Sequence, residues 1–116
     1  MKFLLAGISA KYIHTCLAVY SLAGYAREQY GIDCRTAEFT INQSEDLILS
    51  ELYRQAPDLL GFSCYIWNYA MIRRLVRSLK KVLPGTRILL GGPEVSFDAP
   101  RALLESGADF VLSGEG

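Results

Sequence analysis

The residues best suited to binding chemistry follow directly after two short apolar runs. Residues 88–90 (Ile-Leu-Leu) lead into Gly91-Gly92-Pro93-Glu94, and residues 59–62 lead into Ser63-Cys64-Tyr65-Ile66-Trp67. Paired glycines let a backbone pass close to a flat or bulky group, because no Cβ stands in the way. Aromatic rings opposite such open backbone suit a large planar ligand held by contact and stacking. Two plainer interpretations stay open: the glycines form a strand-ending turn, and the rings close the end of the core.

A third candidate segment follows the apolar run at residues 3–6, as a loop that begins at Gly7 and ends near Thr15. Its candidate binding residues are Ser9, Lys11, Tyr12, His14 and Thr15. The loop lacks the G-x-G-x-x-G of a dinucleotide-binding fold and the G-K-[ST] of a phosphate-binding loop. A phospho-acceptor domain would need carboxylates where Gly7 and Ser63 stand. No Ser-His-Asp set or paired carboxylate cluster in the sequence indicates catalysis by this chain alone.

Strand-like and helix-like patterns alternate along the chain. The expected strands cover residues 3–6, 34–39, 59–62, 88–90 and 110–112, and the expected helices begin near Thr15, Ser44, Asn68 and Asp98. Ser44 and Asn68 suit helix N-caps. Spacing predicts buried faces that consist of Leu47, Ile48, Leu52 and Tyr53 on the second helix and of Ile72, Leu75, Val76, Leu79 and Leu83 on the third. The outer, solvated face of the third helix is expected to carry Arg73, Arg74, Arg77, Lys80 and Lys81.

This alternation predicts an α/β fold: a three-layer, Rossmann-like (flavodoxin-like), doubly wound sheet of five parallel strands in the order 2-1-3-4-5. The strand at 34–39 alternates in character and carries Arg35 and Glu38, so we expect it at an edge of the sheet. In such sheets, ligands bind at the carboxyl ends of the strands, where strands one and three part. Residues 1–116 form one domain.

Composition excludes several classes of partner. The 116 residues are 51% hydrophobic and 21% charged, and 12 basic residues balance 12 acidic ones. This balance gives no field that would attract nucleic acid or anionic lipid. No apolar run approaches the roughly 18 residues of a membrane span, and the N-terminus is too short for a signal-peptide core. We therefore expect a cytoplasmic protein with no nucleic-acid or membrane partner.

The three cysteines, Cys16, Cys34 and Cys64, are too far apart in sequence for a C-x-x-C metal or redox pair. Their odd number also disfavours a disulfide framework. All three are interpreted as structural, and Cys64 is the one expected to line a site. No metal-ligand set is expected in this chain.

The second half of the chain resembles a known family. Gly91-Gly92-Pro93, Pro100, Gly107-Ala108-Asp109, Val111 and Gly114-Glu115-Gly116 resemble the cobalamin-binding domain that precedes many radical S-adenosylmethionine (SAM) domains. The loop at 12–15 and the loop that begins at Ser63 fit the same family. The resemblance covers essentially the whole chain, and its second half is the more specific part.

This resemblance implies a corrin ring over the strand ends, with its nucleotide tail threaded between strands one and three. Ser63 would meet the tail, and Gly91 and Gly92 would let it pass. The implied cofactor-binding residues are Ser9, Lys11, Tyr12, His14, Thr15, Ser63, Cys64, Tyr65, Trp67, Gly91, Gly92, Pro93, Glu94, Gly114 and Glu115. The implied partner is a downstream radical SAM domain in the same polypeptide, which would hold SAM and a [4Fe-4S] cluster on a C-x-x-x-C-x-x-C motif. The chain would then be an N-terminal fragment.

The expected function is to present cobalamin to that catalytic domain. The whole protein would be a methyltransferase or catalyse a radical rearrangement, and this chain alone would not be catalytic. A corrin needs cover on both faces, so the isolated chain should bind cobalamin weakly or not at all. Two alternatives stay open: a degenerate docking module that no longer binds cobalamin, and a flavodoxin-like binder of another flat cofactor such as FMN. The second is weakened because the first loop lacks a run of Ser and Thr hydroxyls for a phosphate.

His14 is the only histidine and the obvious candidate to ligate cobalt. Cobalamin domains that use histidine carry D-x-H-x-x-G, where the Asp orients the imidazole and the Gly gives room to the tail. Here the corresponding residues are Tyr12, His14 and Leu17, so both supporting residues are missing. Loss of such a supporting partner typically costs about 10–100-fold in metal affinity. We expect His14 to order the loop or start the helix through backbone hydrogen bonds, and not to bind cobalt.

Overall fold

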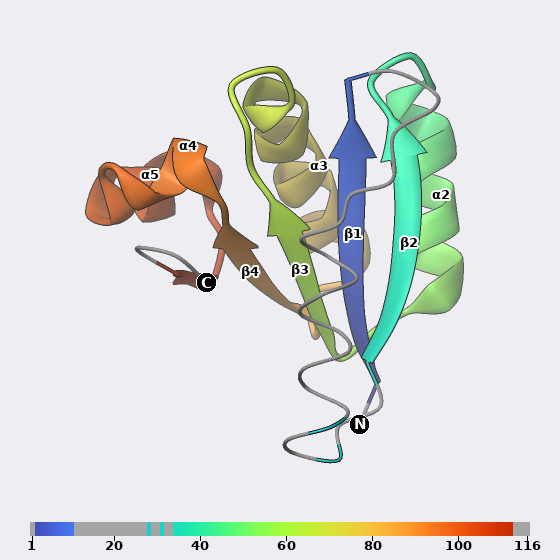
Figure 1. Cartoon of the computed structure of the whole chain (residues 1–116). Helices are drawn as coiled ribbons and strands as arrows, with labels where there is room; N and C mark the ends of the chain where they lie inside the picture. The colour runs from blue at the N-terminus through green and yellow to red at the C-terminus, as the bar shows by residue number, and fades with distance from the viewer. Residues whose placement is uncertain (1, 11–27, 29–30, 32–33, 113–116) are drawn as a thin grey trace.

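Five parallel strands form one sheet in the order β2-β1-β3-β4-β5 (Figure 1). The strands are β1 (Phe3–Ser9), β2 (Cys34–Thr40), β3 (Leu59–Ser63), β4 (Arg87–Gly91) and β5 (Phe110–Val111). The structure, a computed structural model, describes residues 2–10, 28, 31 and 34–112. The strand order confirms the flavodoxin-like sheet expected from the sequence, and it confirms β2 as an edge strand.

Four helices are described: α2 (Glu45–Gln55), α3 (Tyr69–Val82), α4 (Pro93–Ser96) and α5 (Ala99–Ser106). α2 and α3 lie side by side behind the sheet, and α5 packs beside α3 (Figure 1). The helix expected at 15–30, which would supply the layer on the opposite face, lies outside the described residues. In the described part of the chain, no helix has the length and apolar character needed to cross a membrane.

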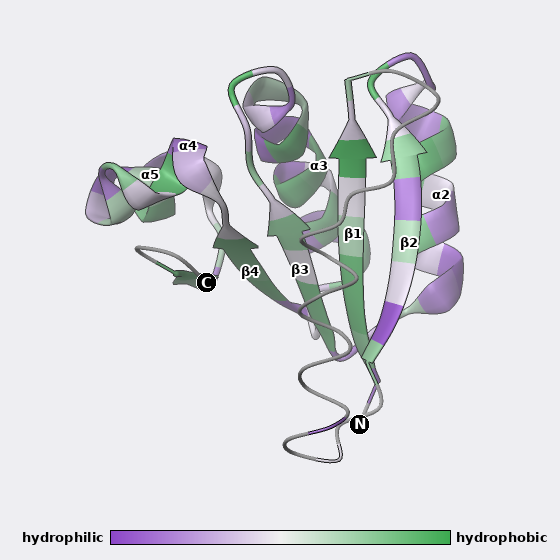
Figure 2. Cartoon of the chain, in the orientation of Figure 1, coloured by the Kyte–Doolittle hydropathy of each residue, from purple (hydrophilic) through white to green (hydrophobic). Residues whose placement is uncertain are grey.

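Alternate residues of the central strands build the core under α2 and α3. Leu4, Ala6 and Ile8 of β1 are buried, because even-numbered residues of this strand point to the helices. The same core contains Leu60, Phe62, Ile88 and Leu90 from the strands and Ile48, Leu52, Ile72, Leu75, Val76 and Leu79 from the helices. Figure 2 shows that the central strands are hydrophobic and that the edge strand β2 is partly hydrophilic. Burial of each large side chain contributes about 1.5–3 kcal/mol.

The predicted buried faces are confirmed on α3 and half wrong on α2. On α3, four of the predicted residues are fully buried and Leu83 packs against the core while partly buried. On α2, Ile48 and Leu52 are buried, but Leu47 and Tyr53 are exposed. α2 lies beside α3 at the β2 side of the sheet, so it meets the core through a narrow stripe of Ile48 and Leu52 with the partly buried Leu49 beside them.

Two segments that were expected to be loops are regular structure. β1 continues to Ser9 and does not end at Ala6, because β2 pairs with it as far as Ser9 opposite Thr40. After Gly92, Pro93 begins the short helix α4, where the sequence indicated only a loop. Proline is well tolerated at the first helical position, since its missing N–H would have no intrahelical partner there.

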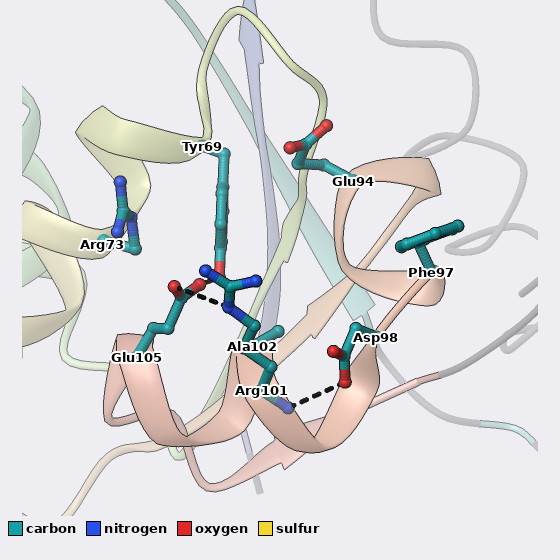
Figure 3. A pocket seen from close by; sticks show the side chains of 8 residues that line it. All are labelled: Tyr69, Arg73, Glu94, Phe97, Asp98, Arg101, Ala102 and Glu105. Carbon is teal, nitrogen blue, oxygen red and sulfur yellow. Dashed lines mark hydrogen bonds and ion pairs between the residues drawn. The ribbon is translucent and has the colours of Figure 1, made fainter.

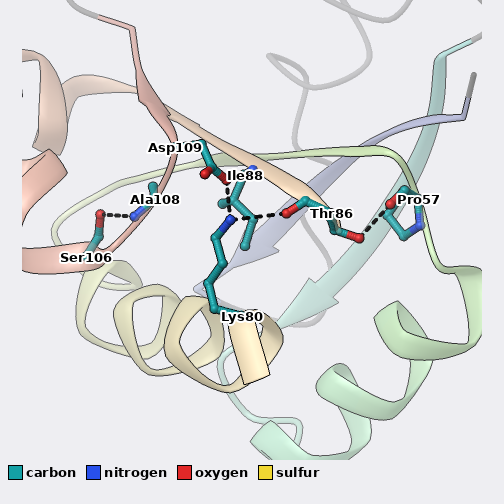
Figure 4. A network of polar contacts seen from close by, with 7 residues as sticks. All are labelled: Pro57, Lys80, Thr86, Ile88, Ser106, Ala108 and Asp109. Atoms are coloured by element: carbon teal, nitrogen blue, oxygen red, sulfur yellow. Dashed lines mark hydrogen bonds and ion pairs between the residues drawn. The ribbon is translucent and has the colours of Figure 1, made fainter. Parts of the chain in front are cut away.

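A polar network closes the amino ends of β4 and β5 (Figure 4). The Asp109 carboxylate accepts hydrogen bonds from the Ile88 backbone N–H, at 2.7 Å, and from the Lys80 ammonium. The buried Thr86 hydroxyl donates to the Pro57 carbonyl at 2.6 Å. Lys80 is thus a partly buried residue that bonds to Asp109, and it is not the solvated residue expected from the sequence. Burial raises the pKa of Asp109, but the bonds from Lys80 and Ile88 outweigh it and hold the pKa below its ordinary value.

Candidate functional site

The carboxyl ends of β1, β3 and β4 bring three candidate residues to one edge of the sheet. Ser63 lies opposite Gly91 in register, and Ser9 is the last residue of the adjacent β1. Side chains alternate along a strand, so Ser9, Ser63 and Gly91 face away from the core under α2 and α3. The sequence prediction that these residues gather at the strand ends is confirmed for the part that is described.

Several predicted site residues cannot be placed. Lys11, Tyr12, His14, Thr15, Gly114 and Glu115 lie outside the described residues. Their proposed contacts with a cofactor stay predictions, and so does the role expected for His14.

The loop between β3 and α3 presents a pair of stacked rings. The centroids of Tyr65 and Trp67 lie 4.7 Å apart, and the ring planes differ by 3°. Trp67 is 47% exposed and Ile66 is 81% exposed. Trp67 therefore does not close the end of the core, which was the plainer interpretation of this residue. A flat, partly exposed aromatic surface next to the strand ends can contact a planar ligand.

Asn68 holds this loop in place, although its side chain does not cap α3 as expected. It is 1% exposed, and its amide oxygen accepts from the Tyr65 backbone N–H at 2.8 Å. Its amide nitrogen donates to the carbonyls of Ile8, at 2.9 Å, and Ser63, at 3.2 Å. Sequence reasoning missed this role. The role depends on the amide lying next to two strand ends, and this position cannot be known without the fold.

The two adjacent glycines have different roles. Gly92 has φ 98° and ψ 171°, a conformation that is essentially restricted to glycine. A Cβ there would lie 2.6 Å from the Cys64 carbonyl oxygen, so Gly92 is required by the chain itself. At Gly91, no atom of the described residues other than its two chain neighbours lies within 4 Å of the Cβ position. Gly91 is therefore the residue of the pair with an open Cβ position.

Cys64 supports the loops through its backbone. Its N–H donates to the Gly91 carbonyl at 2.7 Å, and its carbonyl accepts from the Glu94 N–H at 3.2 Å. The side chain is fully buried, and burial, followed by the Glu94 charge, raises the pKa of the thiol to about 12. It therefore stays a neutral thiol, which is a poor metal ligand. Cys34 is also a buried thiol that forms no disulfide among the described residues, which agrees with the structural interpretation of both described cysteines.

A groove of about 330 Å³ lies between α3 and the α4–α5 segment (Figure 3). The Tyr69 hydroxyl donates to Glu105 at 3.1 Å, and the Arg73 guanidinium lies 4.9 Å from the Tyr69 ring centroid. Burial and this hydrogen bond raise the pKa of Tyr69 to about 12. Arg73 is half-buried, whereas the sequence predicted that it would be solvated. Of the two arginines and three carboxylates along the groove, Arg101 pairs with Glu105, whereas the buried Nε of Arg73 has no hydrogen-bond partner among the described residues.

The edge formed by Gly91, the two serines and the stacked rings has the features of a site for a large planar group. It combines backbone without side chains, flat apolar surface and a few polar groups. In residues 2–10 and 34–112, no cluster of three or more His, Cys, Asp or Glu could hold a metal ion.

Comparison with known proteins identifies the family. The model of the B12 binding domain matches residues 4–116. The chain belongs to this family. The B12-binding family assignment covers both the segments that the structure describes and the loop that contains His14.

Two relatives match a shorter part of this B12-binding domain. The first is 2-(S-pantetheinyl)-carbapenam-3-carboxylate methyltransferase from Streptantibioticus cattleyicolor, 36% identical over 62 residues. The second is the cobalamin-dependent radical SAM methyltransferase TokK from Streptomyces tokunonensis, 34% identical over 62 residues. Each match covers 52% of this chain but only 9% of the relative.

Solved structures confirm the fold. A cobalamin-binding protein from Desulfitobacterium hafniense matches with a TM-score of 0.67 at 16% identity, over 97% of this chain and 52% of the other. The response regulator DrrB from Thermotoga maritima matches with a TM-score of 0.62 at 16% identity, over 100% of this chain and 47% of the other. At such identities the likeness concerns the architecture alone.

Proposed function

We propose that this domain binds cobalamin at the carboxyl ends of β1, β3 and β4 and presents it to a radical SAM domain in the same polypeptide. The observation that carries the proposal is the open Cβ position at Gly91 in a member of the B12-binding family. The loop that follows the neighbouring strand β3 carries the rings of Tyr65 and Trp67, which stack on each other. A ligand with a broad flat surface would use both features.

Each described residue would have a limited task. Gly91 would allow close approach, Trp67 would contact an apolar face of the macrocycle, and Ser63 would offer a hydroxyl to the nucleotide tail. Gly92 and Cys64 would hold the two loops together beneath it. When bound, cobalamin supplies a cobalt ion that can carry a methyl group and pass it on. His14 would order its loop, and the neutral Cys64 thiol would not compete for the cobalt.

The relatives support the proposal of a partner domain. The chain matches only 9% of the length of two methyltransferases, one of which is named as cobalamin-dependent and radical SAM. We therefore propose that SAM and a [4Fe-4S] cluster belong to another part of the polypeptide and that the whole protein is a methyltransferase. The cytoplasmic location expected from the sequence stays a prediction.

Titration of hydroxocobalamin into the full-length natural protein tests the proposal. Binding should shift the visible corrin absorption, and Gly91→Leu should weaken the affinity at least about tenfold, or 1.4 kcal/mol. Gly85→Leu is the matched control, because its Cβ position is equally open but lies at the other end of the sheet. Absence of any retained corrinoid in the wild-type protein would contradict the proposal and favour a docking module. Residues 1–116 alone should bind more weakly than the full-length protein, since they cover one face of the corrin.

A further inference from the structure

The pairing between β1 and β3 stops before either strand ends. The last paired residues are Ala6 and Phe62, yet β1 stays paired with β2 as far as Ser9, and β3 stays paired with β4 as far as Ser63. The two central strands therefore part at their carboxyl ends. Where the strands part, backbone carbonyls on both sides of the opening have no partner in the β-ladder. Buried carbonyls require a hydrogen-bond donor from elsewhere.

The side chain of Asn68 fills this need. Its amide nitrogen donates to the Ile8 carbonyl on one side of the opening and to the Ser63 carbonyl on the other. Its amide oxygen accepts from the Tyr65 N–H, so the planar amide uses both of its ends. At 1% exposure, this side chain is shielded from bulk water. A short, rigid group that bonds both strand ends sets the width of the opening between them.

We propose that Asn68 is a positioning residue that holds β1 and β3 apart at the ligand site, through its paired donation to Ile8 and Ser63. This inference rests on the proposed function, because the opening is where the nucleotide tail of cobalamin would enter. The contact with Tyr65 has a separate effect: it fixes the loop that carries the Tyr65–Trp67 stack. Asn68 itself need not touch the ligand.

Two substitutions separate the two contacts. Asn68→Ala removes all three side-chain bonds, whereas Asn68→Asp keeps an acceptor for the Tyr65 N–H but offers only oxygen to the two carbonyls. If paired donation sets the opening, both variants should bind hydroxocobalamin at least about tenfold more weakly, or 1.4 kcal/mol. The measurement is an absorption titration of the full-length protein at a temperature where each variant is folded. Asn42→Ala is the control, because exposed Asn42 contributes a backbone N–H, not its side chain, to its hydrogen bond with Thr40.

A readout without cobalamin tests the positioning role directly. Amide hydrogen exchange at Tyr65 should accelerate in Asn68→Ala, where its acceptor is lost, and stay near the wild-type rate in Asn68→Asp. If Asn68→Ala fails to fold, Asn68→Ser replaces it, and its single hydroxyl donor should give an affinity between those of wild type and Asn68→Asp. Wild-type affinity in Asn68→Asp would overturn the inference and leave the proposed function intact. Failure of the wild-type protein to bind cobalamin would overturn the proposed function, and with it the role of Asn68 at that site.

Discussion

The two ends of the sheet are built differently. At the amino end, charged and polar side chains tie the elements together, as in the bonds from Lys80 to Asp109 and from Thr86 to Pro57 (Figure 4). At the carboxyl end, the loops are held by backbone hydrogen bonds and by the Asn68 amide, and large apolar residues such as Ile66 and Phe97 are exposed. Exposed apolar surface at a strand end lowers stability unless something covers it.

Under the proposed function, this difference places stability and binding at opposite ends of one sheet. No ligand would enter at the amino end, so side chains can close it. The carboxyl end would have to stay open for cobalamin, so its rigidity would come from the main chain and from a residue that bridges the opening without filling it. Substitutions at the two ends should therefore have different consequences.

The largest expected effect is that of Gly92→Ala. The substitution places a Cβ 2.6 Å from the Cys64 carbonyl oxygen in a backbone region that only glycine adopts readily. It should lower the free energy of unfolding by about 3 kcal/mol, measured by denaturant titration. The adjacent Gly91→Ala is the matched control and should change the free energy of unfolding by less than about 1 kcal/mol. Equal losses from the two variants would show that Gly91 is also required by the fold.

Asp109→Ala tests the amino end. It removes the acceptor for the Ile88 N–H and for the Lys80 ammonium, whose side chain is only 28% exposed. The free energy of unfolding should fall by about 2 kcal/mol, while the affinity of the folded protein for cobalamin stays unchanged. Glu51→Ala is the control, because its partner Arg54 is 75% exposed and the loss should be below about 0.5 kcal/mol. A change in cobalamin affinity in Asp109→Ala would show that the amino end also contributes to binding, contrary to the separate roles of the two ends.

The same residue gives the amino end a pH dependence. The pKa of Asp109 is lower in the folded protein than in the unfolded chain, so its contribution is fully present above the unfolded pKa. It is lost as the pH falls through the folded pKa. The difference in unfolding free energy between wild type and Asp109→Ala should therefore be largest near neutral pH and shrink below about pH 4. A difference that grew on acidification would contradict the sign of this shift.

The smallest effect on stability is expected for Trp67→Ala at the carboxyl end. Trp67 is 47% exposed, so the free energy of unfolding should change by less than about 1 kcal/mol. Loss of ring contact should weaken cobalamin binding by about 3–10-fold, measured by the same absorption titration. Tyr53→Ala removes an aromatic ring of similar exposure from α2 and should leave binding unchanged. Unchanged affinity in Trp67→Ala would remove the stacked pair from the proposed site.

The sequence predicted the sheet because local patterns determine it. Apolar runs such as 59–62 and the clean stripe of α3 indicate strand and helix without knowledge of their neighbours. The charged residues Arg35 and Glu38 likewise indicated the edge strand correctly. The exposure of Leu47 was missed because it depends on where α2 lies in the sheet.

The site was only partly predictable for the same reason. Residue types indicated Gly91, Ser63 and Trp67 as candidates. The different roles of the two glycines depend on the position of the Cys64 backbone, in the loop that follows another strand. The role of Asn68 depends on a contact with Ile8, 60 residues away. Such long-range contacts leave no local pattern in a single sequence.

Amide hydrogen exchange with and without hydroxocobalamin tests the central claim most directly. Bound to the full-length natural protein, cobalamin should slow exchange in residues 63–68 and 91–97, at the carboxyl ends of β3 and β4. The amides of Ile88 and Asp109, which belong to the amino end, should exchange at unchanged rates. Protection that appears at the amino end instead, or no protection in residues 63–68 and 91–97 when cobalamin is bound, would contradict the assignment of the binding site.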